Sequence, residues 1–149
     1  MSKSDELPLC FIHKTTYTNF AFQVNIKFLK SGKNAGAGLF FRSNSTMPAL
    51  YRFFVETIDY SYTFDTEVPR KLVTTNSSGS ISTIHPGSNQ WNLLTVIAKG
   101  SDFYLYINTK FVDKVTDNTY PSGAIGLFAS RVDNASTDVA FQNLKVWIL

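Results

Sequence analysis

Two charged residues stand within stretches of the sequence that are otherwise strongly apolar. Arg42 follows Leu-Phe-Phe in residues 38–43, and Glu56 lies within residues 50–59. A guanidinium in such a strand must be paired with a carboxylate or must face a groove. Glu56 can accept hydrogen bonds from a ligand or pair with Arg42 or Arg52. Arg42 is therefore the first candidate for a binding residue, and an ion pair with Glu56 is the structural alternative.

Motifs for nucleophilic or zinc-assisted catalysis are absent from the sequence. No G-x-S-x-G elbow presents a serine nucleophile, and neither H-E-x-x-H nor a Cys/His cluster indicates zinc. Cys10, His13 and His85 are isolated in the sequence from any catalytic partner. These three residues therefore predict no catalytic site.

Alternation of apolar and polar residues with a period of two predicts the elements that carry the charged residues. One face of a strand would hold Phe20, Phe22, Val24, Ile26 and Phe28, which helical spacing would scatter around the axis. Further strands are expected at 38–43, 50–59, 60–64, 70–75, 91–99, 103–107, 111–115, 124–129 and 138–148. The Ser-rich residues 76–83 are expected to form an exposed connection. About ten strands with turns every 8–12 residues are typical of a β-sandwich or barrel.

Composition favours an all-β domain and excludes several classes of protein. The 149 residues include only 3 Glu, the residue that usually covers exposed helix faces, whereas Thr, Val, Ile and aromatic residues are abundant. The 14 Lys and Arg are scattered among 11 Asp and Glu, so we expect no nucleic-acid-binding surface. No apolar run approaches the ~18 residues that a membrane span needs. The single cysteine, Cys10, excludes an internal disulfide.

The chain is predicted to fold as one domain over residues 15–149. Residues 1–14 are expected to form an N-terminal tail with an edge strand. The apolar stretch 7–12 is too short for the core of a signal peptide. An unpaired edge strand would allow two copies of the chain to associate.

Five segments of the sequence carry a resemblance to a known superfamily. They are AGAGLFFRS (35–43), YRFFV (51–55), WNLLTVIAKGSDFYLYIN (91–108), YPSGAIGLFA (120–129) and VAFQNLKVW (139–147). In order and spacing they resemble the concanavalin A-like lectin and glucanase superfamily. The resemblance is narrowest to the branch of levan-binding carbohydrate-binding modules and 3-keto-disaccharide hydrolase-like domains, and laminin-G-like modules are more distant. It implies a jelly-roll β-sandwich of two antiparallel sheets, one of them concave.

Two departures from the superfamily pattern accompany this resemblance. Only about 14 residues precede the segment that begins at Tyr17, where the superfamily carries additional strands. We therefore expect the usual N-terminal strands to be lacking. Asn108-Thr109 stands where an Asn-Gly hairpin turn is expected.

The resemblance also implies a carbohydrate site on the concave sheet or on the loops at its rim. It places an arginine at position 42 on that sheet, where the planar fork would bind sugar hydroxyls, with Arg52 and Glu56 as further polar candidates. Because the C–H faces of sugars pack on aromatic rings, exposed rings are candidate stacking platforms. These candidates are Tyr51, Tyr60, Tyr62 and Trp91. Most of the 13 Phe, 7 Tyr and 2 Trp must belong to the core, and Trp147 is expected there.

A glycosidase of this superfamily would need two carboxylates at alternate positions of one strand. A retaining mechanism places the carboxyl groups about 5 Å apart. Glu56 and Asp59 are three positions apart, so they would face opposite sides of a strand. Asp65 and Glu67 have the alternate spacing, but Pro69 follows, and residues 65–69 are interpreted as a connection between strands. We therefore predict no catalytic residue.

Calcium is the one cofactor that the resemblance leaves open. Lectin-like sandwiches bind calcium through loop carboxylates and backbone carbonyls, although no EF-hand pattern is present here. The side chains that supply suitable oxygens are Asp113, Asp117, Asn118, Asp133 and Asp138. No other cofactor is expected.

These observations together predict a non-catalytic carbohydrate-binding module whose partner is a polysaccharide or glycan, serving as an appendage to a partner domain. The resemblance favours an extracellular or cell-surface location, although the sequence contains no signal peptide. A protein-interaction domain of the laminin-G type, without a sugar site, is the alternative, and a glycosidase is the third. A groove containing Arg42 and exposed rings would favour the sugar, whereas a flat or self-paired face would favour protein contact.

Overall fold

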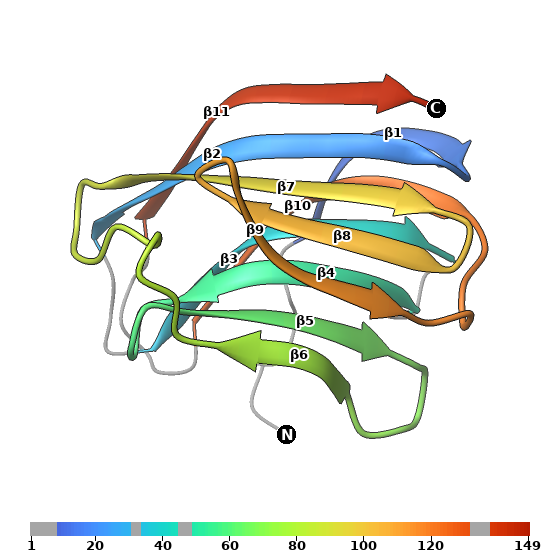
Figure 1. Cartoon of the computed structure of the whole chain (residues 1–149), viewed down its shortest axis with the longest axis horizontal. Coiled ribbons are helices and arrows are strands. Elements are labelled where there is room, and N and C mark those ends of the chain that lie inside the picture. The colour runs from blue at the N-terminus through green and yellow to red at the C-terminus, as the bar shows by residue number, and fades with distance from the viewer. Residues whose placement is uncertain (1–8, 31–33, 45–48, 132–137) are drawn as a thin grey trace.

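Two antiparallel sheets lie face to face in the computed structural model of the chain (Figure 1), which describes residues 9–30, 34–44, 49–131 and 138–149. The described residues form a six-stranded and a five-stranded sheet. The six-stranded sheet has the order β1 (Leu9–Tyr17), β10 (Gly123–Arg131), β3 (Ala35–Ser43), β4 (Leu50–Glu56), β5 (Ser61–Glu67) and β6 (Thr74–Gly79). The five-stranded sheet has the order β11 (Asp138–Ile148), β2 (Phe20–Lys30), β7 (Trp91–Lys99), β8 (Asp102–Ile107) and β9 (Lys110–Thr116).

The all-β prediction and the sandwich of two antiparallel sheets are confirmed. The described residues contain no helix, and so none that could cross a membrane. The boundaries differ from the prediction most clearly between residues 50 and 79, where the strand predicted at 70–75 begins only at Thr74. The strand predicted at 50–59 ends at Glu56, β5 continues to Glu67, and β6 includes part of the Ser-rich segment that was expected to be a connection.

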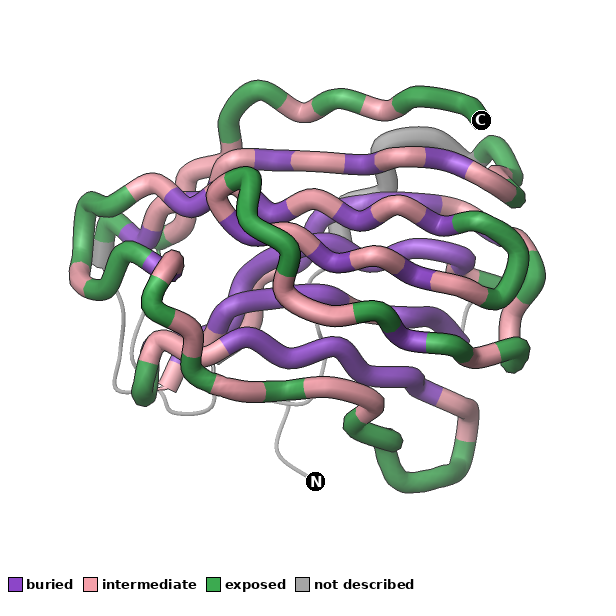
Figure 2. Tube along the Cα trace, viewed as in Figure 1, coloured by how far each residue is buried: buried purple, intermediate pink, exposed green. Residues whose placement is uncertain are grey.

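The hydrophobic core fills the space between the sheets. Figure 2 shows buried and half-buried residues alternating along β2 and β7, as a period of two requires. The apolar residues predicted for one face of β2 are all buried. Four rings form the centre of the core, with centroids 4.7 to 5.8 Å apart: Phe41, Tyr51, Phe64 and Phe103.

Strand β3 is buried on both of its faces, which explains its nearly continuous apolar sequence. Its inward residues join the main core, and Phe40 joins a second apolar cluster on the outer face of the six-stranded sheet. The other members of this cluster are Leu50, Phe54 and Phe128. A side chain at Gly38 would collide with the backbone of Phe53 and Phe54, so the glycine allows β4 to lie against β3. The outer face of β3 and β4 thus has an apolar floor.

Candidate functional site

Arg42, the first candidate for sugar binding, lies inside the sandwich and not on a groove. Only 1% of the residue is exposed, and its guanidinium donates to the carbonyl oxygens of Thr18 at 2.7 Å and Tyr120 at 3.0 Å. The guanidinium carbon also lies 4.9 Å from the ring centroid of Phe103. Burial lowers the pKa of Arg42. The predicted groove position is therefore wrong, and so is the alternative of an ion pair with Glu56.

The backbone explains why Arg42 points inward. Its φ is 50°, and the register of β3 against β10 shifts between Ala124 and Gly126. Such an irregularity interrupts the strict alternation of a strand, so Arg42 follows Phe41 to the inner side. There it joins β3 to the turn at Thr18 and the loop at Tyr120.

Tyr51 is also a core residue, which corrects its prediction as a stacking platform. Its ring is fully buried and lies 4.7 Å from that of Phe103. Its hydroxyl donates to Asp117 Oδ1 at 2.5 Å and accepts from the backbone N–H of Tyr120 at 3.2 Å. Burial, reinforced by the bond to Asp117, raises the pKa of Tyr51 to about 12. Tyr51 therefore anchors the loop between β9 and β10.

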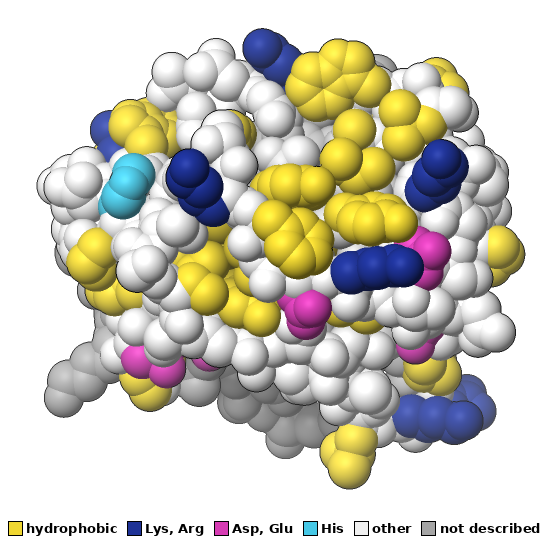
Figure 3. Space-filling view, viewed as in Figure 1, with side chains coloured by type: hydrophobic (Ala, Val, Ile, Leu, Met, Phe, Trp, Pro, Cys, Tyr) yellow, Lys and Arg dark blue, Asp and Glu magenta, His cyan; other side chains and the backbone are white. Residues whose placement is uncertain are grey.

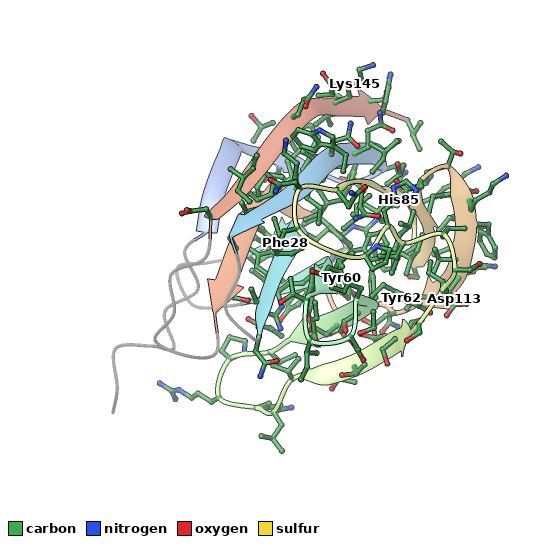
Figure 4. All side chains as sticks on the ribbon, turned by 90° about the vertical axis from the view of Figure 1, so that its left-hand side faces the viewer. Phe28, Tyr60, Tyr62, His85, Asp113 and Lys145 are labelled. Atoms are coloured by element: carbon green, nitrogen blue, oxygen red, sulfur yellow. The ribbon has the colours of Figure 1, made fainter. Side chains whose placement is uncertain are left out.

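The other predicted rings do not share one surface. Tyr60 lies in the turn between β4 and β5 and packs half-buried against the core, while Tyr62 is buried and bonded to Ser77 at 2.9 Å. Figure 4 shows Tyr60 and Tyr62 in the view that faces one end of the sandwich. Trp91 lies on the outer face of the other sheet, where Lys27 Nζ is 4.5 Å from its ring centroid. Trp147, which was expected in the core, is 44% exposed.

The structure does bring a charged cluster together on the outer face of the six-stranded sheet. Arg52 lies directly opposite Asp65 in the pairing of β4 with β5. Its Nε donates to Asp65 Oδ1 at 2.9 Å, and its Nη2 donates to Asp65 Oδ2 at 2.6 Å. Nη2 also lies 3.2 Å from Glu67 Oε1. We call these three residues, together with Glu56 on the same face of β4, the acidic cluster.

Asp65 and Glu67 correct the interpretation of residues 65–69 as a connection. Both residues belong to β5, and alternation places both carboxylates on the outer face. The alternation of inward Tyr62 and Phe64 with outward Thr63 and Asp65 in the sequence indicates that the strand continues through Asp65. Pro69 led to the interpretation of residues 65–69 as a connection, but β5 continues to Glu67 and ends two residues before the proline.

The acidic cluster places more negative than positive charge on an apolar floor. Burial raises the pKa of Asp65, and the hydrogen bond and charge of Arg52 oppose this shift. Burial also raises the pKa of Glu67, again against the attraction of Arg52. The guanidinium carbon of Arg52 lies 4.9 Å from the Phe54 ring and 5.4 Å from the Phe128 ring. The bidentate pair fixes the guanidinium plane across this floor.

Glu56 is the more accessible carboxylate of the acidic cluster. It is half-buried, and burial followed by the charge of Asp59 raises its pKa. A hydrogen bond from Thr63 and the charge of Arg52 act in the opposite direction. Of the six predicted binding residues, Arg52 and Glu56 are thus the two that the structure places on one face.

Two of the side chains considered for calcium, Asp113 and Asp117, are engaged within the fold. Asp117 Oδ1 accepts from Tyr51 and from the backbone of Thr119, and Asp113 Oδ2 accepts from Ser77 at 2.6 Å. Among the described residues, no group of three or more His, Cys, Asp or Glu side chains is arranged to hold a metal ion. Asp133 and the side chains of Cys10 and His13 lie outside the described part of the chain.

Comparison of the sequence with protein-family models and with curated proteins finds no match. Solved structures do resemble this fold. The carbohydrate-binding module CBM66 of Bacillus subtilis is 21% identical, with a TM-score of 0.74 over 89% of this chain and 76% of that one. Sheep galectin-11, solved with glycerol, is 12% identical, with a TM-score of 0.62 over 99% of this chain and 100% of that one.

A glycosidase is also among the similar structures. The β-glucanase of Bacillus licheniformis is 12% identical, with a TM-score of 0.64 over 91% of this chain and 68% of that one. Carbohydrate-binding and carbohydrate-cleaving proteins thus share this architecture. The chain has the jelly-roll sandwich fold of the concanavalin A-like lectins and glucanases, as the five sequence segments implied.

Proposed function

We propose that the chain is a non-catalytic carbohydrate-binding module that holds a neutral polysaccharide or glycan at the acidic cluster. The observation that carries this proposal is the bidentate pairing of Arg52 with Asp65 over the rings of Phe54 and Phe128. Carboxylates accept hydrogen bonds from sugar hydroxyls, and the half-buried Glu56 is the accessible carboxylate of the cluster, while the buried rings of Phe54 and Phe128 support the Arg52 guanidinium from below. The similar structures that bind carbohydrate support the proposal at the level of the fold.

Arg52 retains donors for a ligand although it is paired. Its bonds to the carboxylates use Nε and Nη2, and among the described residues none involves Nη1. The side chain is 12% exposed. A sugar oxygen that meets Nη1 would therefore be bound by a guanidinium whose plane is already fixed, which reduces the entropy lost on binding.

Affinity electrophoresis in gels containing fructan, β-glucan, xylan or mannan tests the proposal. We expect one of these neutral polymers to retard the folded chain. Arg52→Lys keeps the charge but removes the planar fork, and Glu56→Gln removes the negative charge and one of the two acceptor oxygens. Each loss of a charged hydrogen bond should weaken binding roughly tenfold or more. Asp138→Asn, an exposed carboxylate at the start of β11, is the matched control and should bind as the parent does.

A glycosidase is a second candidate because Asp65 and Glu67 share one face of β5. Arg52 contacts both carboxylates, which opposes the division into one protonated and one ionised group that a general acid and a nucleophile require. Release of reducing ends from the retained polymer by the parent, lost in Asp65→Asn, would establish this function. Binding without release would contradict it.

A protein-interaction domain is favoured by the self-paired charges of the acidic cluster. If none of the four polymers retards the parent, the carbohydrate proposal for this cluster is wrong. A search for a protein partner would then follow.

A further inference from the structure

The outer face of the five-stranded sheet carries a row of apolar side chains that crosses four strands and ends at a lysine on the fifth. Register places Trp147 beside Ala21, Ala21 beside Ile97, Ile97 beside Tyr104, and Tyr104 beside Lys114. Four strand spacings of ~4.8 Å make this row about 19 Å long. The aliphatic side chains of Ala21 and Ile97 lie between the rings of Trp147 and Tyr104. Trp147, at one end of the row, is 44% exposed.

A second row runs beside the first and is polar at its centre. It consists of Lys145, Gln23, Thr95, Tyr106 and Phe111, in the order β11, β2, β7, β8 and β9. The hydroxyl of Thr95 donates to Gln23 Oε1 at 3.2 Å. The rings of Tyr106 and Phe111 lie edge to face with centroids 5.7 Å apart, and Phe111 is 59% exposed. We call the two rows together the basic platform.

The charge on this face is positive. The outward positions of these strands carry four lysines, Lys27, Lys99, Lys114 and Lys145, and, within the described residues, two acidic residues, Asp102 and Asp138. Lys114 Nζ lies 3.7 Å from Asp102 and 5.6 Å from the Tyr104 ring. Figure 3 shows the rings of this face with Lys and Arg side chains around them. The acidic cluster on the opposite sheet has the reverse sign, so an anionic ligand is directed to the basic platform.

We propose that the basic platform is a second binding site, and that its ligand is an anionic polysaccharide that bears carboxylate or sulfate groups. Sugar C–H faces would stack on Trp147 and Tyr104, and hydroxyls would bond to Gln23 and Thr95. The acidic groups would pair with the surrounding lysines. This site goes beyond the proposed function, because it lies on the other sheet and selects the opposite charge.

The polar centre of the platform distinguishes this ligand from a lipid surface. Gln23 and Thr95 stand between the ring-bearing ends of the rows. An acyl layer would take water from their amide and hydroxyl groups without offering hydrogen bonds, at a cost in free energy. A polysaccharide offers hydroxyls at the same places.

Affinity electrophoresis of the full chain in polygalacturonate gels, with neutral galactan gels as the reference polymer, tests this proposal. We expect polygalacturonate to retard the parent and added salt to weaken the retardation. The double variant Lys27→Gln with Lys145→Gln should weaken binding roughly tenfold, since it removes two positive charges from this face. Trp147→Ala should weaken binding without changing the net charge.

The matched control is Arg70→Gln with Lys71→Gln, which removes the same charge at exposed positions between β5 and β6. Equal losses in the two double variants, or no retardation by polygalacturonate, would overturn the proposal. Pelleting of the parent with phosphatidylserine vesicles but not with the polymer would also overturn it, as would self-association in sedimentation equilibrium that Trp147→Ala abolishes. Neutral binding that depends on Glu56 belongs to the acidic cluster, so the two proposals can fail separately.

Discussion

Arg52 and Asp65 face each other directly across β4 and β5, and two hydrogen bonds of 2.9 and 2.6 Å join them. The side chains are only 12% and 4% exposed, so the pair is a buried one. Glu67 adds a second carboxylate to the same guanidinium at 3.2 Å. The cluster therefore couples the stability of the six-stranded sheet to the groups proposed to meet a ligand.

Removing one partner of this pair should destabilise the chain more than replacing both. Asp65→Ala leaves the Arg52 guanidinium buried on Phe54 and Phe128, and we expect the free energy of unfolding to fall by about 3 kcal/mol. Arg52→Leu with Asp65→Leu should lose less, because both charges of the bidentate pair are removed and Glu67, which then lacks Arg52, has a pKa raised by burial and can take up a proton. Urea denaturation measures both. A larger loss in the double variant than in the single one would contradict this account of the pair.

Arg42 should be essential for stability and not for ligand binding. Arg42→Met removes the two hydrogen bonds that the guanidinium donates, and the carbonyl oxygens of Thr18 and Tyr120 lose their donor. We therefore expect a loss of about 3 kcal/mol in the free energy of unfolding. Arg70→Met, at an exposed position that also has a positive φ, is the control and should change little. Variants measured below their melting temperature should bind as the parent does. If the folded Arg42→Met variant does not bind the ligand, Arg42 contacts the ligand and the purely structural role is wrong.

The strands that could be predicted from the sequence are those with an uninterrupted alternation of apolar and polar residues. The inward residues of β2 alternate without interruption, so both the strand and its buried face follow from a period of two. For other residues, burial depends on where the strand lies in the sandwich. Tyr51 has the same local pattern as an exposed ring on a strand, but the opposite sheet covers it with Phe103. No local pattern in the sequence distinguishes these two outcomes.

Three errors in the sequence-based predictions have local causes. The positive φ of Arg42 reverses the face that alternation assigns to it, and no glycine marks this position. Trp147 was predicted as core because of Val146 and Ile148, but alternation places Trp147 on the outer face beside Ala21. Asp65 was missed because Pro69 suggested an earlier end to β5. The sequence therefore identified charged residues on strands as candidates for a site. Which face of the sheet each one occupies, and which residue it pairs with, could be determined only from the structure.

Tyr51 and Asp117 should give the chain a stability that acid removes. Burial opposes ionisation of Asp117, but hydrogen bonds from Thr119 and Tyr51 outweigh it and hold the pKa of Asp117 below its usual value. The lowered pKa stabilises the fold above about pH 4, and this contribution is lost as the pH falls through the folded pKa. Tyr51→Phe should therefore cost about 1–2 kcal/mol at pH 7 and less below pH 4. Thermal melts of both chains measure this difference, and a cost independent of pH would assign it to packing alone.

Glu67 should have the opposite dependence on pH. Burial raises its pKa, so the folded chain binds this proton more tightly than the unfolded chain does. The associated stability is complete below about pH 4 and is lost as the pH rises through the raised folded pKa. Glu67→Gln imitates the neutral form, so its stability relative to the parent should increase between pH 4 and pH 7. The backbone carbonyl of Glu67 still accepts from the Tyr120 hydroxyl in this variant, which keeps the loop contact unchanged. Urea denaturation of both chains across this range tests the sign, and a relative stability that decreases with pH would show that attraction to Arg52 outweighs burial.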